Sequence, residues 1–198
     1  MNLQKSNFVR LFFIFLFVTI TVFAVFTRQE TMNDKQKLPI QLIVLKQSSN
    51  MNDHPLVAMY QYFNHKHVLA IYEVLQNDKY KFRAINSVVI DKTPTLLTND
   101  KFSHGIWVKL GNNWEYFDEN LLRKSRDTSY ISSLPKYSTE SQFDEQNHTI
   151  SIPHGKQFLT FKENERPIKI FQLDENNQYF LVLYRNDVKV LVSYNEVD

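Results

Sequence analysis

The residues whose types could bind a metal ion are the histidines, and two of them, His65 and His67, lie two positions apart. In a β-strand such a pair points to one face, so with His54 or Glu73 as a third ligand it would suit zinc. The polar residues around the pair instead indicate the tip of a hairpin, and no HExxH pattern occurs. We therefore expect no metal site and no cofactor.

Other catalytic chemistry also finds little support in the sequence. The absence of cysteine excludes disulfides, thiolate ligands and thiol nucleophiles, and the 3 glycines are too far apart for a phosphate-binding loop. Paired carboxylates could hydrolyse glycosidic bonds if a cleft brought them together. The candidate pairs are Asp118-Glu119, Glu163/Glu165 and Asp174-Glu175. Each lies at an expected turn or helix start, where capping explains it, so we predict that the protein is not an enzyme.

Three aromatic residues, Trp107, Trp114 and Tyr116, lie on an expected hairpin over residues 106–117. If Trp107 faces away from the core, it meets Trp114 across the hairpin and offers a contact patch to a partner. The alternative is that these residues belong to the core. The three are our candidates for partner contact.

The elements that must position these residues are mostly strands, because alanine is scarce and valine, isoleucine, phenylalanine and tyrosine are abundant. We predict an antiparallel meander and then a hairpin at Gly111-Asn112-Asn113, with a short helix over residues 119–124 capped by Asp118. Strands are expected over residues 40–46, 57–64, 67–75, 79–90, 106–110, 114–117, 149–152, 157–162, 167–173, 178–185 and 188–194.

Residues 125–147 are rich in serine, threonine and acidic or amide side chains and read as a linker. They divide a β-rich lobe over residues 28–124 from a C-terminal β lobe over residues 148–198, which we expect to be a small barrel or sheet. Residues 28–136 carry 15 basic and 11 acidic side chains, net +4, and residues 137–198 carry 6 basic and 10 acidic, net −4. Opposite charges suggest that the lobes dock, although chance explains the imbalance equally simply.

The N-terminal segment predicts a membrane anchor. Residues 8–27 are apolar except for Arg10, and a helix of that length spans roughly 30 Å, the thickness of a hydrocarbon core. Lys5 and Arg10 are the orientation signal, which places residues 1–7 in the cytoplasm and residues 28–198 outside. A signal peptide cleaved after Ala24 is the alternative.

The C-terminal region resembles bacterial SH3-like modules over residues 155–197. The resemblance is carried by Gly155-Lys156, by residues 178–185 before a polar turn, and by residues 189–192 leading to Tyr194 and Val197. It implies a small β-barrel that binds peptides or cell-wall peptides. Such modules often carry a glycine-tryptophan pair where this chain has Val190-Leu191, so no binding residue is assigned on this basis. The overall layout resembles small membrane-anchored proteins of firmicute bacteria.

Together these features predict a mainly β, single-pass membrane protein with an extracytoplasmic domain that has a binding, sensing or envelope-assembly role. Its partners would be the lipid bilayer, through residues 8–27, and a protein or another component of the cell envelope. Nucleic acid is not expected, because residues 28–198 carry no net charge. Two alternatives stay open: an envelope hydrolase that acts through carboxylates, and a cytoplasm-facing regulator on an anchor of reversed orientation.

Overall fold

The computed structural model describes residues 41–50, 53–75, 81–185 and 187–193. The chain divides into two compact units, Met1–Lys37 and Leu38–Asp198, and every described residue belongs to the second. The predicted anchor over residues 8–27, with Arg10 and Ala24, therefore lies outside the described residues, as does Lys5. Within the described ranges, no helix has the length and apolar character needed to cross a bilayer.

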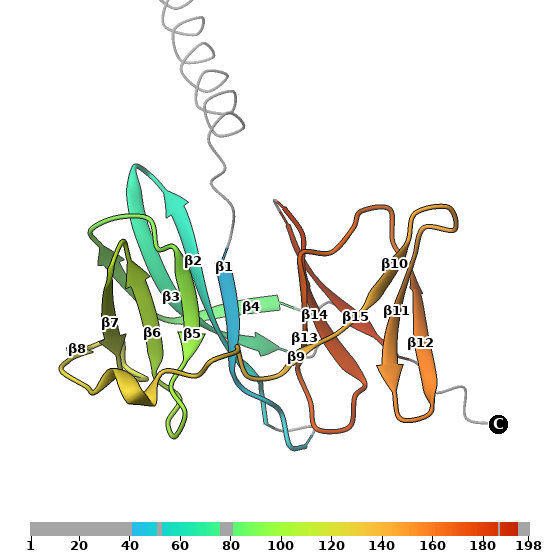
Figure 1. Cartoon of the computed structure of the whole chain (residues 1–198), viewed down its shortest axis with the longest axis horizontal. Helices are drawn as coiled ribbons and strands as arrows, with labels where there is room; N and C mark the ends of the chain where they lie inside the picture. Colours follow the sequence, from blue (N-terminus) through green and yellow to red (C-terminus); the bar gives the residue numbers. More distant parts are fainter. Residues whose placement is uncertain (1–40, 51–52, 76–80, 186, 194–198) are drawn as a thin grey trace, which may run out of the picture. The chain divides into compact units, whose positions relative to one another are not determined.

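The first sheet is a meander of four antiparallel strands in the order β1-β2-β3-β4 (Figure 1). The strands are β1 (Gln41–Lys46), β2 (Leu56–Phe63), β3 (Lys66–Leu75) and β4 (Lys81–Ile90). Asn64 and His65 close the β2–β3 hairpin with φ angles of 49° and 61°. Two successive positive φ values are typical of the type I′ turn, whose twist matches that of the strands it joins.

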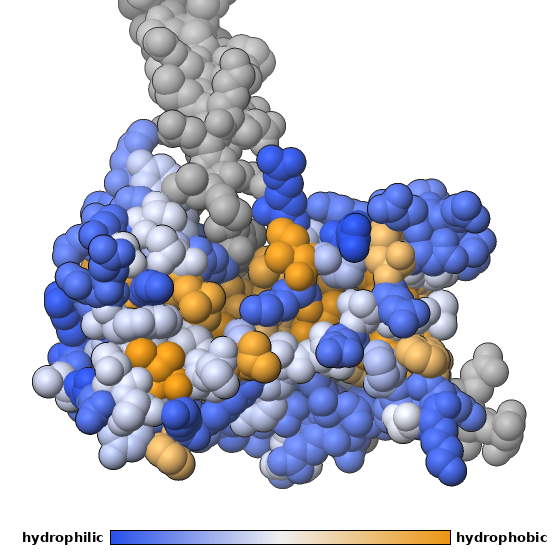
Figure 2. Space-filling model, viewed as in Figure 1, coloured by the Kyte–Doolittle hydropathy of each residue, from blue (hydrophilic) through white to orange (hydrophobic). Residues whose placement is uncertain are grey.

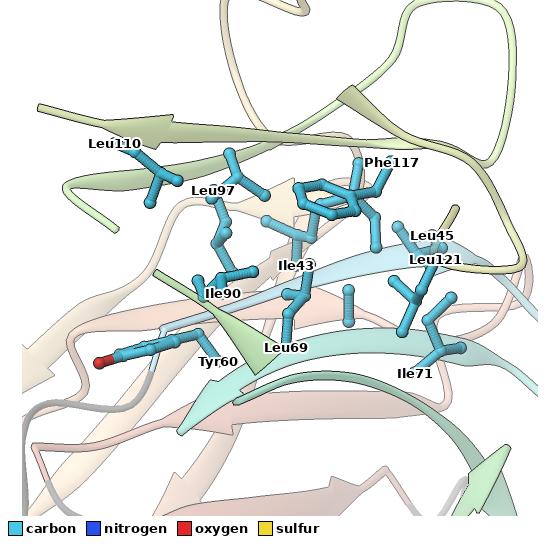
Figure 3. Close-up of a cluster of buried hydrophobic side chains, with 13 residues drawn as sticks. Ile43, Leu45, Tyr60, Leu69, Ile71, Ile90, Leu97, Leu110, Phe117 and Leu121 are labelled. Carbon is cyan, nitrogen blue, oxygen red and sulfur yellow. The ribbon is translucent and has the colours of Figure 1, made fainter. Parts of the chain in front are cut away.

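A second antiparallel sheet covers one face of the first. It consists of β5 (Leu96–Asn99), β6 (Ile106–Leu110), β7 (Asn113–Phe117) and β8 (Arg123–Lys124), in that order. Alternate residues of both sheets point into a shared core that includes Ile43, Tyr60, Leu69, Val108 and Phe117 (Figure 3).

The C-terminal half also contains two sheets. One has the order β15-β14-β13-β9 and the other the order β10-β11-β12. Their strands are β9 (Ser138–Thr139), β10 (Gln142–Asp144), β11 (Thr149–His154), β12 (Gln157–Lys162), β13 (Lys169–Gln172), β14 (Tyr179–Leu183) and β15 (Val188–Val192). Ile150, Ile152, Phe180 and Val182 belong to the core between these two sheets.

A third core joins the N-terminal half, which contains β1–β8, to the C-terminal half, which contains β9–β15. Leu42, Val44 and Val57, on the face of the first sheet turned away from β5–β8, pack with Phe171 and Leu181 of the C-terminal half. Leu42–Leu45 and Val57–Tyr60 are consequently buried at every position, because both faces of their sheet are covered. Such strands read as continuous apolar runs and do not alternate with polar residues. On the face shown in Figure 2, hydrophobic residues gather in a band across the middle.

Hydrophobic burial, and not charge, holds the halves together. Each ion pair among the described residues joins two residues of the same half. The two halves also share backbone hydrogen bonds, from the Ser48 N–H to the Leu173 carbonyl at 2.8 Å and from the Glu175 N–H to the Ser48 carbonyl at 3.2 Å. Within the part of the chain that the structure describes, the opposite net charges of the halves therefore have no counterpart in an ion pair between them.

The predicted mainly β, antiparallel class is confirmed. The helix predicted over residues 119–124 is wrong, because Leu121 adopts a φ of 60° in a tight turn and residues 123–124 form β8. Within the expected linker over residues 125–147, the structure has the 3-10 helix η1 (Thr128–Tyr130) and strands β9 and β10, which pair with β13 and β11. The SH3-like resemblance of residues 155–197 stays a prediction.

We expect that replacing Leu181 with alanine lowers the free energy of unfolding by about 2–5 kcal/mol, because it leaves a cavity in the core that joins the halves. Urea unfolding should remain a single transition when followed both by tryptophan fluorescence, which reports on the first half, and by circular dichroism. Leu134→Ala is the control and should change stability by no more than about 0.5 kcal/mol, because Leu134 is exposed. Two separate transitions in the wild-type protein would show that the halves fold independently.

Candidate functional site

A buried carboxylate, Asp100, follows directly after β5 and has no exposed surface. Its Oδ1 accepts hydrogen bonds from the Phe102 N–H at 3.0 Å and from the Ser103 N–H and hydroxyl, both at 2.9 Å. These local bonds form a tight turn, a conformation that aspartate favours because its side chain reaches backbone amides two or three residues ahead.

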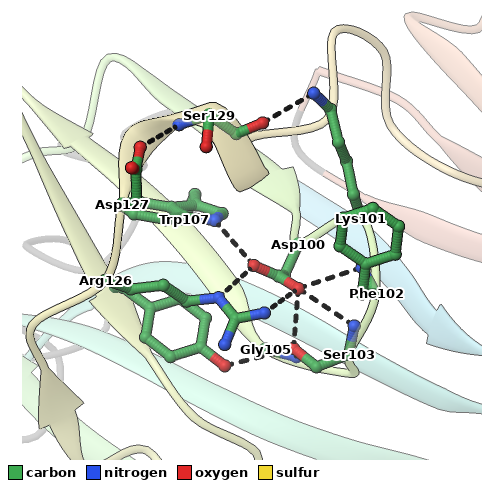
Figure 4. Close-up of polar contacts among 10 residues, drawn as sticks. Asp100, Lys101, Phe102, Ser103, Gly105, Trp107, Arg126, Asp127 and Ser129 are labelled. Carbon is green, nitrogen blue, oxygen red and sulfur yellow. Dashed lines mark hydrogen bonds and ion pairs between the residues drawn. The ribbon is translucent and has the colours of Figure 1, made fainter.

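The same carboxylate binds the side chain of Arg126, 26 residues further along the chain. Arg126 Nε lies 2.6 Å from Asp100 Oδ2, and its Nη2 lies 2.9 Å from Oδ1 (Figure 4). Trp107 Nε1 donates a third bond to Oδ2 at 3.2 Å. The two parallel bonds form a bidentate arginine–carboxylate pair, which fixes the orientation of both groups as well as their distance.

Two tyrosine rings flank the Arg126 guanidinium. Its central carbon lies 4.9 Å from the Tyr116 ring centre and 4.7 Å from that of Tyr130, which are cation–π distances. The Tyr116 hydroxyl lies 3.1 Å from the Ser103 hydroxyl and so joins the turn. Gly105 lets this ring approach, because a Cβ atom there would overlap it.

Burial on its own would raise the pKa of Asp100, because a buried carboxylate loses its hydration. Hydrogen bonds outweigh burial and hold the pKa below its usual range; the donors are Arg126, the Phe102 N–H, Ser103 and Trp107. Asp100 is therefore ionised at neutral pH. A carboxylate of this kind stabilises the fold above its unfolded pKa of about 4, and the stabilisation is lost as pH falls through the lowered value.

The Asp100–Arg126 pair fixes the strap, which we define as residues 125–136. The strap also bonds to β5 and its following turn through its backbone. The Lys101 N–H donates to the Tyr130 carbonyl at 2.9 Å, and the Ser132 N–H donates to the Asn99 carbonyl at 3.0 Å. The strap is thus a packed layer over the outer face of β5–β7.

Asn99 extends this attachment to the first sheet. Its buried side chain accepts a hydrogen bond from the Lys136 N–H at 2.8 Å and donates to the Val44 carbonyl at 2.7 Å. Thr98 adds a bond from its hydroxyl to the Ser132 carbonyl at 3.1 Å. One amide side chain therefore links the end of the strap to the edge of β1.

Above this buried network lies an exposed group that we call the aromatic platform, formed by Phe102, Arg126 and Tyr130. Phe102 is 76% exposed and Tyr130 is 37% exposed, and their ring centres lie 5.6 Å apart in an edge-to-face arrangement. The Arg126 side chain is 29% exposed. Two aromatic rings and a guanidinium thus share a surface whose backbone is fixed by Asp100.

The structure separates the three aromatic residues predicted to contact a partner. Trp107 and Tyr116 are buried, and their rings lie 5.2 Å apart. Trp114 is half-buried, and the Lys109 ammonium lies 5.6 Å from its ring centre. Trp107 lies opposite Tyr116 in the hairpin, and Lys109, not Trp107, lies opposite Trp114. Trp107 and Tyr116 are therefore buried beneath the aromatic platform, where the Tyr116 ring contacts Arg126.

The paired histidines also lie at the predicted turn. His67 Nδ1 lies 2.8 Å from the Tyr60 hydroxyl, and its ring contacts that of Tyr62. The His65 ring meets Tyr62 edge-on. Across the described ranges, no three histidine or acidic side chains are grouped as metal ligands.

One carboxylate of each acidic pair binds a lysine or backbone N–H groups. Asp118 accepts the Leu122 N–H at 2.9 Å and lies 2.5 Å from Lys124 Nζ. Glu163 lies 2.9 Å from Lys189 Nζ. Asp174 accepts the Gln178 N–H at 3.0 Å and the Tyr179 N–H at 2.9 Å.

Sequence reasoning missed Asp100, Phe102, Arg126 and Tyr130. Asp100 looks like an ordinary turn residue, and Arg126 begins a polar segment that resembles a linker. No spacing rule joins two charges that are this far apart in the chain. The one usable signal was the density of tryptophan and tyrosine on the 106–117 hairpin. It indicated the correct region of the fold, but two of the three side chains it pointed to, Trp107 and Tyr116, are buried and not on the surface.

We expect Asp100→Asn to lower the free energy of unfolding by about 1.5–3 kcal/mol, because it removes the buried charged acceptor shared by Arg126, Trp107 and the Phe102 N–H. Thermal and urea unfolding would measure the loss. Asp127→Asn is the matched control, because Asp127 is exposed, caps η1, and asparagine caps equally well. Equal stability of the two variants would show that the buried pair does not hold the strap.

No protein-family model, curated protein or solved structure matches this chain. Its function must therefore be inferred from its own residues, above all from the aromatic platform and the network beneath it.

Proposed function

We propose that the protein is a single-pass membrane protein whose extracytoplasmic domain binds a protein partner of the cell envelope and has no catalytic role. The observation that carries the binding proposal is the aromatic platform of Phe102, Arg126 and Tyr130. Tyrosine, arginine and exposed aromatic side chains dominate the energetic centres of protein interfaces.

The platform is already ordered before any partner arrives. Arg126 is fixed by its bidentate pair with Asp100, and Tyr130 by ring contacts and a backbone bond to Lys101. Phe102 lies within the turn whose amides bind the same carboxylate. A surface fixed in this way loses little conformational entropy on binding, which favours affinity.

A binding role agrees better with Asp100 than acid–base catalysis does. Its carboxylate accepts bonds from Arg126, Trp107, Ser103 and the Phe102 N–H, so its lone pairs are occupied. A general base needs a free lone pair within reach of a substrate proton. The alternative of an envelope hydrolase gains no support from this site.

The location rests on the sequence. Residues 8–27 supply the apolar span, and Lys5 and Arg10 supply the orientation signal. An added protease should therefore digest a C-terminal tag on the full chain in intact cells whose outer layers have been made permeable. Digestion only after the membrane itself is opened would instead favour the cytoplasm-facing regulator, and a cytoplasmic control protein shows that the membrane stayed closed.

The platform is tested by in-cell crosslinking of the full chain. We expect Phe102→Ala to weaken partner capture by about 30-fold, the effect of an interface centre worth about 2 kcal/mol. Stability should change by no more than about 0.5 kcal/mol, because Phe102 is largely exposed. Phe158→Ala is the matched control. This phenylalanine on β12 is likewise largely exposed, at 57%. Capture that survives Phe102→Ala, or that Phe158→Ala reduces as much, contradicts the proposal.

A further inference from the structure

The end of the first sheet at which β1 begins carries a further inference. Gln41, the first residue of β1, lies opposite Tyr60, so the start of β1 and the β2–β3 hairpin turn are at the same end of the sheet (Figure 1). Between the predicted span over residues 8–27 and β1, residues 28–40 extend over at most about 45 Å. A span over residues 8–27 would therefore hold this end of the domain within that distance of the bilayer.

Two other turns lie at the same end. β4 runs antiparallel to β3, so the segment that follows β4 leaves the sheet here, and Gln41 Nε2 donates to its Pro94 carbonyl at 2.6 Å. Lys92 Nζ lies 3.4 Å from the position that a Cβ atom on Gly111 would take, which brings the β6–β7 turn beside this segment. We call the surface formed by residues 63–66, 91–93 and 110–113 the entry face.

The entry face presents an aromatic ring beside basic side chains. Phe63 is 60% exposed and pairs across the turn with Lys66, which is also exposed, so both side chains lie on one face of the hairpin. Lys92 is exposed as well. Within the described ranges neither lysine forms an ion pair, and Asp91 is the one acidic residue in these three segments. The two ammonium groups are therefore free to bind an anionic surface.

A tryptophan and a third lysine border the entry face. Trp114 follows the β6–β7 turn and lies half-buried opposite Lys109, whose ammonium is 5.6 Å from its ring centre. Tyr62 precedes the β2–β3 turn and is also half-buried. Tryptophan and tyrosine are enriched where proteins meet the headgroup layer of a membrane, and lysine places its charge there at the end of an apolar stem. The entry face and its border thus contain the residue types of a membrane interface.

We propose that the entry face docks on the surface of the lipid bilayer, with the Phe63 ring inserted among the headgroups and with Lys66, Lys92 and Lys109 bound to anionic lipid phosphates. This inference rests on the membrane location in the proposed function. One ring or a few lysines alone bind a membrane only weakly, so stable docking needs both signals. The short connection to the span adds a third contribution, because it keeps the entry face at a high effective concentration near the lipid.

A bilayer suits this surface better than a protein partner does. The exposed apolar area at the tip is a single ring, which is too small for the apolar centre of a protein interface. A headgroup layer accepts one ring and separate lysines without a fixed register. Docking also directs the aromatic platform away from the bilayer, because β5 begins at Leu96 beside the entry face and Phe102 follows its other end. The partner surface then stays accessible.

The absence of cysteine permits a direct test, because one introduced cysteine is the only thiol that a dye can label. The full chain with Asn112→Cys, an exposed position in the β6–β7 turn, carries the donor dye in vesicles whose lipid headgroups carry the acceptor. We expect more energy transfer in vesicles of phosphatidylglycerol and phosphatidylcholine than in phosphatidylcholine alone. High salt should remove the difference, because it screens the lysines from the lipid charges.

Variants of the same labelled chain identify the groups responsible. Phe63→Ala should weaken docking by about 10-fold. Lys66→Gln with Lys92→Gln should weaken it by about 25-fold, or about 5-fold for each lysine. In both cases energy transfer should fall toward its value in phosphatidylcholine. Because these side chains are exposed, the midpoint of thermal unfolding should stay unchanged, which shows that the variants are folded.

The β11–β12 hairpin supplies matched controls. Its turn also carries an exposed lysine and an exposed phenylalanine, Lys156 and Phe158, and neither belongs to the entry face. Lys156→Gln and Phe158→Ala should leave energy transfer unchanged. The proposal is overturned if these two variants reduce transfer as much as the entry-face variants do, if the entry-face variants have no effect, or if the two lipid compositions give equal transfer.

Flotation of the vesicles distinguishes the failure of docking from the failure of the proposed location. A chain that floats with vesicles of both compositions but shows equal transfer overturns docking alone. A chain that floats with neither contradicts the membrane location and overturns docking with it. Phe102→Ala should leave transfer unchanged, since Phe102 lies outside the entry face, so the partner-binding proposal is tested separately.

Discussion

The middle of β1 and of β2 in the first sheet is buried on both faces, and this constraint organises much of the Leu38–Asp198 unit. Ile43 and Tyr60 point into the core shared with β5–β8, while Leu42 and Val44 point into the core shared with β13 and β14. Neither half can leave without exposing one complete face of β1 and β2. Hydrophobic burial at about 25 cal/mol per Å² of apolar surface makes that exposure far more costly than the loss of any surface ion pair.

A second constraint follows from the chain having to cross from one half to the other. The strap over residues 125–136 makes this crossing, and its backbone would be unsatisfied if it ran over β5–β7 without partners. The Lys101 N–H, the Asn99 carbonyl and the buried Asn99 side chain supply those partners, and Asp100 fixes the strap through the Arg126 side chain. The polar network is therefore the means by which a hydrophilic segment is packed against tryptophan and tyrosine. The exposed rings of Phe102 and Tyr130 are attached to this network and are held in place by it.

Much of the fold could be read from local patterns. The β-branched and aromatic runs marked most of the longer strands, and Gly111 and the Asn64–His65 pair marked hairpin turns. The short strands β5, β8, β9 and β10 were missed because two to four residues carry no usable periodicity. The helix expected over residues 119–124 failed because the cap residue Asp118 and two leucines suit a tight turn equally well. Leu121 is buried in the core, and its left-handed backbone conformation, with a φ of 60°, directs its side chain there.

The sequence by itself determined the strand-rich class, the absence of thiol chemistry and the region of the 106–117 hairpin, because composition and short-range spacing are local properties. Only the tertiary structure decided which aromatic side chains face outward. Trp107 and Tyr116 were the candidates for that surface, yet they are buried, because the strap covers them and Asp100 binds Trp107. Phe102 and Tyr130 took their place on the surface. The pairing of Asp100 with Arg126 joins residues that no short-range pattern relates, so packing alone could bring them together.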